Sequence, residues 1–249
     1  MAPKYINFHF EKKGEITEEL ELRAKEAFFL AGTVLEKEWG VSGPIDITVS
    51  LQDDASFRGG QTTGPESWKY CFLMEDPRKI TVYCNIEIFS VLPDDAEKMI
   101  KHETAHLVVN SLVGDLATIR RSYFLHEGTA GLDGATERFV TKMKPTFAKG
   151  YGEAKKENVT EVRDPLSMKS MDDIRGDTNK EPFIDQIDYL TIFSAVEFLR
   201  KRIGERKIIE VFKNIRENGT IEESYERICG EDIGVVISEW EKSIKSKLM

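Results

Sequence analysis

The spacing of apolar residues changes at about residue 90, and this change constrains the fold class. Before it, runs typical of strands occupy residues 5–10, 45–51, 68–74 and 79–85. Between the first two, residues 15–40 carry apolar side chains at helical spacing and end in glycine. The expected order is therefore β-α-β-β-β, which requires a small sheet built within the first third of the chain.

Beyond residue 90 the patterns are helical. Helices are expected over residues 90–114 and 122–144, with three or four more over residues 185–248. Residues 151–182 are polar with few large apolar side chains, and we interpret them as a long irregular insertion. We expect one α+β domain over residues 1–249, with an α/β lobe over 1–90 and a helical lobe over 91–249.

Composition excludes some partner classes. The chain has 249 residues and a net charge of -9, so phosphate backbones and anionic membranes are poor partners, and we expect neither nucleic acid nor membrane binding. An apolar run of about 18 residues is absent, which argues against a transmembrane helix. The first residues are charged too early for a signal peptide, so a cytoplasmic location is expected.

The three cysteines give no zinc-binding CxxC pair. Residues 76–77, Asp-Pro, are a good start for a turn between two expected strands. A turn centred on residues 77–78 would place Cys71 opposite Cys84. A disulfide is one reading of this pair, and packing of two small apolar side chains is favoured in a reducing cytosol.

Residues 102–106 read HETAH. On a helix, residues four apart share a face at about 5–6 Å between Cβ atoms, so His102 and His106 can bind one zinc ion from the same side. Glu103 follows the first histidine and is placed to take a proton from the water that zinc activates. The alternative is two histidines on a solvent-facing helix surface.

Catalytic zinc needs a third protein ligand. Glu127 lies in the next expected helix, in a stretch of apolar and small residues, where a carboxylate requires a partner or a metal. Gly128 and Ala130 would let this helix approach the HETAH helix closely. Two alternatives stay open: an exposed acid balancing the helix dipole, and His126 as the ligand in place of Glu127.

These residues resemble the gluzincin peptidases, specifically the peptidase MA-like domain, a relative of the thermolysin and aminopeptidase groups. That family follows HExxH with WLxEGxA, and residues 124–130 here read FLHEGTA, with Phe124 in place of tryptophan. A helix beginning at Tyr189 and the late Trp240 are similar to the family's C-terminal part. The resemblance covers about residues 78–245.

The resemblance implies a zincin-like fold: a small mixed sheet with an edge strand beside the active-site helix, and a C-terminal helical lobe. Residues 79–85 are the expected edge strand, open on one side, where an extended substrate could add as a further strand. The GxMEN motif of exopeptidases is absent, so aminopeptidase activity is not expected.

The sequence thus predicts a zinc metallopeptidase that acts on a peptide or protein substrate. One zinc per chain would be held by His102, His106 and Glu127, with Glu103 as general base. Tyr189 is expected to stabilise the charge on the carbonyl oxygen, and its alternative is a packed interfacial tyrosine. Alternative functions are a zincin fold retained for binding, with weak or no hydrolysis, and a zinc hydrolase of a non-peptide bond.

Overall fold

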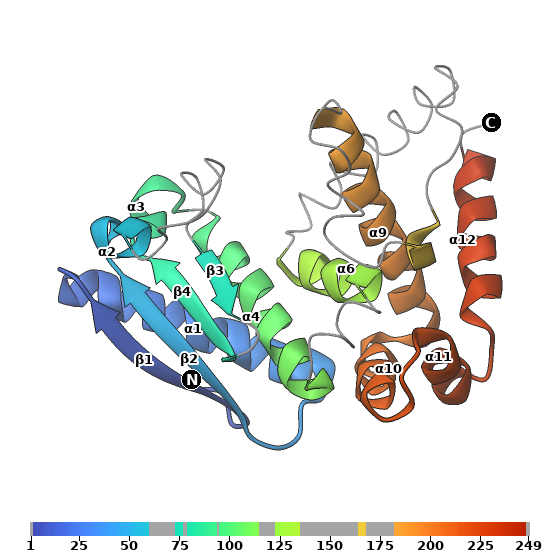
Figure 1. Cartoon of the computed structure of the whole chain (residues 1–249), viewed down its shortest axis with the longest axis horizontal. Coiled ribbons are helices and arrows are strands. Elements are labelled where there is room, and N and C mark those ends of the chain that lie inside the picture. Colours follow the sequence, from blue (N-terminus) through green and yellow to red (C-terminus); the bar gives the residue numbers. More distant parts are fainter. Residues whose placement is uncertain are drawn as a thin grey trace. The chain divides into compact units, whose positions relative to one another are not determined.

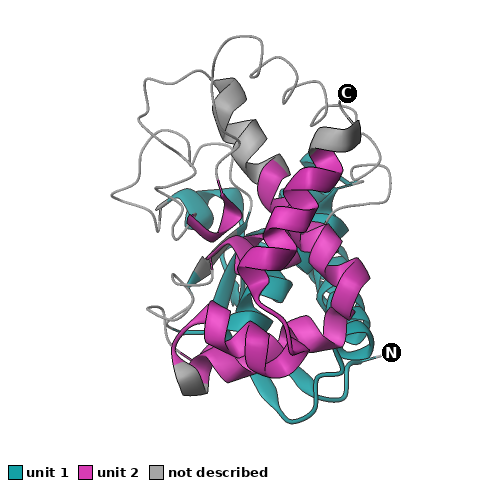
Figure 2. Ribbon diagram, turned by 90° about the vertical axis from the view of Figure 1, so that its right-hand side faces the viewer, with its two compact units in different colours: residues 1–111 teal, residues 112–249 magenta. Residues whose placement is uncertain are grey.

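The structure of the protein is a computed structural model. The structure describes residues 2–59, 73–76, 79–93, 95–114, 123–134, 164–167 and 182–247. Two compact units divide the chain, residues 1–111 and residues 112–249 (Figure 2). The division expected at residue 90 lies earlier than this boundary, and most of the helix that carries His102 and His106 belongs to the first unit.

The first unit contains a four-stranded mixed sheet (Figure 1). Its strands are β1 (Ile6–Lys13), β2 (Ile45–Gln52), β3 (Leu73–Asp76) and β4 (Thr81–Asn85). They lie in the order β1-β2-β4-β3, with β3 antiparallel to β4 and the other pairs parallel. The predicted β-α-β order is confirmed, because α1 (Glu18–Trp39) connects the parallel strands β1 and β2.

Helix α1 ends where its sequence predicts, at Gly40, and begins at Glu18, three residues after the expected start. The Thr17 side chain accepts a hydrogen bond from the Leu20 N–H at 3.3 Å, and Gly40 closes the helix in a left-handed conformation with φ 62°. A Cβ at Gly32 would lie 2.7 Å from the Phe8 ring, so glycine permits close packing of the helix on β1. Aromatic contacts such as Phe8 with Phe28, 5.7 Å between centroids, fill this layer of the core.

The prediction that residues 79–85 form the sheet edge is wrong. Strand β4 pairs with β2 on one side and with β3 on the other, so β3 is the edge strand at that end of the sheet. A substrate therefore has no open strand edge to join along β4. Within β4, Val82 and Cys84 are fully buried, and Thr81 is buried as well.

The register of the β3–β4 hairpin also differs from the prediction. The turn starts where expected, and the Lys79 N–H donates to the Asp76 carbonyl at 3.1 Å. Ile80 then adopts a left-handed conformation with φ 48°, and strand pairing resumes only at Thr81, opposite Asp76. This shifts the register by two residues, because four residues rather than two connect the paired positions.

Cys84 consequently faces Leu73, not Cys71. It is a free, buried thiol, so the disulfide reading is excluded and apolar packing is the role that the structure gives it. Burial raises the pKa of Cys84 to about 12. Cys71 lies outside the described residues.

Within the described residues, three further helices belong to the first unit, wholly or in most of their length: α2 (Asp54–Gly59), α3 (Ile88–Val91) and α4 (Ala96–Val113). Helix α2 follows β2 closely, and the Asp53 carboxylate accepts from the Ser56 N–H at the start of the helix at 2.8 Å. The helix expected over residues 90–114 is split into α3 and α4. It ends as predicted, with Gly114 at φ 84°.

The second unit is helical in its described part. It contains α6 (Tyr123–Gly134), the short η2 (Pro165–Ser167), α9 (Pro182–Ile203), α10 (Glu205–Asn218), α11 (Ile221–Cys229) and α12 (Ile233–Lys247). The prediction of three or four C-terminal helices is confirmed. Apart from residues 164–167, the expected insertion over 151–182 lies outside the described residues until α9 begins, as does the expected helix beyond residue 134.

Specific polar contacts tie the C-terminal helices together. The buried Trp240 indole on α12 donates to the Ser194 hydroxyl on α9 at 3.1 Å. Arg202 at the end of α9 makes a bidentate pair with Glu231, at 2.9 and 2.6 Å, and a further pair with Glu239. Among the described helices, none combines the length and apolar character needed to cross a bilayer.

Candidate metal centre

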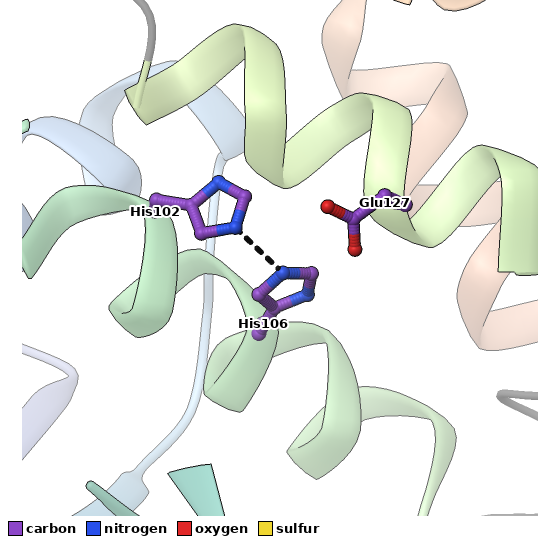
Figure 3. Close-up of side chains that lie close together, drawn as sticks. All are labelled: His102, His106 and Glu127. Carbon is purple, nitrogen blue, oxygen red and sulfur yellow. Dashed lines mark hydrogen bonds between the residues drawn. The ribbon is translucent and has the colours of Figure 1, made fainter. Parts of the chain in front are cut away.

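Helix α4 presents both histidines on one face. His102 is half-buried and His106 is 6% exposed, while Ile100 and Leu107 on the same helix are fully buried. The two Nε2 atoms lie 3.0 Å apart, and the rings stand at 90° to each other (Figure 3). The i, i+4 spacing of the sequence has therefore produced convergent ring nitrogens.

This separation between the Nε2 atoms suits two different states of the pair, with and without a metal. Two nitrogens on one tetrahedral zinc, each at about 2.0–2.1 Å from the metal, lie about 3.3 Å apart. The observed 3.0 Å is a few tenths of an ångström shorter. Without a metal the same distance suits one N–H···N hydrogen bond between the rings. In either state the rings are already aimed at a common point.

Glu127 on α6 completes a group of three possible metal ligands. One ligand atom from each of His102, His106 and Glu127 can be chosen so that all lie within 4.8 Å of one another (Figure 3). Two imidazoles and one carboxylate are a donor set that suits catalytic zinc, and the residues fit the ion.

His126 does not join this group, although it is adjacent to Glu127 and only 4% exposed. Among the described residues, Glu127 is therefore the side chain that supplies a third donor beside the histidine pair. This arrangement favours the carboxylate over the imidazole that competed with it in the sequence.

The small residues after Glu127 do let α6 pack closely, but on a different helix from the one expected. A Cβ at Gly128 would lie 2.9 Å from Val196 Cβ and 3.0 Å from Ile192 Cγ2, both on α9. At Gly131 it would overlap the ring of Phe193, also on α9. Gly128 and Gly131 thus let α6 lie close to α9, which holds the α6 backbone beside Glu127.

Tyr123 is a residue that the sequence reasoning missed. It is the first residue of α6, four before Glu127, and its hydroxyl donates to Glu127 Oε2 at 3.5 Å. The signal was present, since residues four apart on a helix share a face.

Of the two residues expected to act in catalysis, the structure describes the side chain of one. Glu103 is half-buried on α4, next to His102. Tyr189 belongs to α9, but its side chain lies outside what the structure describes.

Comparison with known proteins adds no relative. No protein-family model, no curated protein and no solved structure matches this chain.

Proposed function

We propose that this chain is a zinc-dependent peptidase in which His102, His106 and Glu127 hold one zinc ion. The observation that carries the proposal is the convergence of these three donors within 4.8 Å, with Glu103 directly after the first of them. A zincin-like fold is part of the proposal. It is supported by a mixed sheet in the same unit as the helix that bears HETAH.

Bound zinc would supply a Lewis acid that polarises a carbonyl and lowers the pKa of water toward about 7. Glu103 would act as the base, accepting the proton of the attacking water and passing it to the leaving amine nitrogen. Its position on α4 beside His102 keeps its carboxylate on a rigid element. His102 and His106 would bind through Nε2, the atoms that already converge.

The neighbouring Glu103 is the reason to prefer hydrolysis over other metal chemistry. Two histidines and one carboxylate also suit non-haem iron(II), but that chemistry does not require a carboxylate next to the first histidine. A peptide or protein is the proposed substrate. A binding protein with the same metal, and a hydrolase of another bond, are the competing functions.

Metal analysis and a matched variant test the proposal together. Purified protein should contain about one zinc per chain, and His106→Ala should lose it. Glu103→Gln keeps the side-chain shape but cannot accept the proton, so it should retain zinc. It should cleave a panel of quenched peptides at least about 10²-fold more slowly than wild type.

Each other outcome has a distinct meaning. Zinc without cleavage of any peptide favours the binding function or a non-peptide substrate. A Glu103→Gln variant as active as wild type contradicts the general-base role. Iron in place of zinc would refute the proposal, and so would a wild-type chain that binds neither metal.

A further inference from the structure

Tyr123 and Glu127 form a pair within one helix. Both side chains are half-buried at the start of α6, and the phenol hydroxyl donates to Oε2 of the carboxylate at 3.5 Å. That distance is at the long end of hydrogen bonding, so a modest movement of the carboxylate decides the strength of the contact.

We propose that Tyr123 is a positioning residue for Glu127: its hydroxyl, which donates to Oε2, holds the carboxylate in place for the metal. The inference rests on the proposed function, because it assigns a role toward the metal that the function requires. A glutamate loses side-chain entropy when it is fixed, and a hydrogen bond made before metal binding reduces the free energy that the metal must supply.

The position of Tyr123 suits this role better than a purely packing one. Carboxylates that bind metals are themselves hydrogen-bonded, and loss of such a partner typically weakens metal binding about 10–100-fold. The tyrosine is on the same helix as its partner, so the pair does not depend on a loop. Gly128 packs closely on α9, which holds the backbone of α6 next to Glu127.

Tyr123→Phe tests the inference, because it removes the hydroxyl and keeps the ring. Metal affinity is measured by competition between the protein and a chromophoric chelator, with zinc and separately with cobalt(II), whose visible spectrum reports ligand geometry. We expect affinity to fall about 10–100-fold and the cobalt spectrum to change. The metal-free variant should unfold at the same denaturant concentration as metal-free wild type.

Tyr5→Phe, a tyrosine before β1, is the matched control and should bind metal as wild type does. Equal affinity in Tyr123→Phe and wild type, with affinity lost in Glu127→Ala, would overturn the inference and leave the proposed function intact. A metal-free Tyr123→Phe chain that is clearly destabilised, with unchanged affinity when folded, would also overturn it in favour of a structural role. A wild-type chain without metal affinity would refute both.

Discussion

The packing of α6 on α9 predicts that Gly128→Ala destabilises the chain, although alanine is the better helix former. The added methyl would lie 2.9 Å from Val196 Cβ and 3.0 Å from Ile192 Cγ2, and closer still to Val196 Cγ2. Ordinary contact begins at about 3.4 Å, so the helices must separate by roughly 0.5–1 Å. Both neighbours are fully buried and β-branched, and neither can rotate away easily.

Two opposing effects set how much Gly128→Ala changes the free energy of unfolding. Overpacking of a filled core costs about 1–3 kcal/mol, and two stiff partners place this site in the upper half of that range. Replacing glycine by alanine within a helix returns about 0.8–1 kcal/mol. The expected net loss in the free energy of unfolding is therefore about 1–2 kcal/mol, or roughly 2–8 °C in melting temperature for a chain of this size.

Denaturant unfolding followed by far-UV circular dichroism measures this loss. Gly234→Ala on α12 is the control, because its nearest neighbour is the end of the Asp232 carboxylate at 3.0 Å, and it should be neutral or slightly stabilising. In a Val196→Ala background the closest overlap is gone, and the penalty should shrink by about 1 kcal/mol. A Gly128→Ala chain as stable as Gly234→Ala would refute the close approach of α6 and α9.

Four further outcomes are expected. Cys84 should resist a thiol reagent at about pH 8 in the folded chain, because burial raises its pKa to about 12; rapid native labelling seen by mass spectrometry would contradict this. Hydrogen bonds from Arg202 lower the pKa of Glu231 from 4.5. These bonds therefore stabilise the folded chain above that pH, and the stabilisation is lost as the pH falls through the lower pKa of the folded state. Denaturation at several pH values should show that the difference in unfolding free energy between wild type and Arg202→Met shrinks below about pH 4.5. Ile80→Gly should be more stable than Ile80→Ala by about 1 kcal/mol, since φ is 48° there; the reverse order in thermal melts would contradict the strain. Tyr189→Phe should retain zinc and lower peptide turnover about 10-fold or more, and unchanged turnover would remove it from the mechanism.

Local features were predictable because the residues that decide them are close in sequence. Gly40 and Gly114 mark helix ends through their tolerance of positive φ, and both do so in the structure. The histidine spacing predicted two rings on one face, and the 3.0 Å separation of the Nε2 atoms bears this out. In each case a short stretch of chain contained all the information.

Features that depend on distant partners were predicted less well. The hairpin register failed because Ile80 takes a left-handed conformation that a β-branched residue rarely adopts, and no local rule anticipates it. Strand β4 was wrongly predicted to be the sheet edge, because its own residues do not indicate that β3 pairs with its second side. Gly128 was correctly read as a site of close approach, but only the packing of α9 shows which helix approaches.

The proposed roles of Glu127 and Tyr123 follow from the same physical requirement. A carboxylate among apolar and small residues needs a partner, and this argument pointed to a metal shared with two histidines. A metal uses one oxygen of a monodentate carboxylate, which leaves the second oxygen in need of its own donor. Within a helix the nearest donor is one turn away, and four residues before Glu127 the chain has a tyrosine whose hydroxyl is 3.5 Å from Oε2. A search for a partner of each carboxylate oxygen of Glu127, and not only for the metal, therefore points to Tyr123 from the sequence.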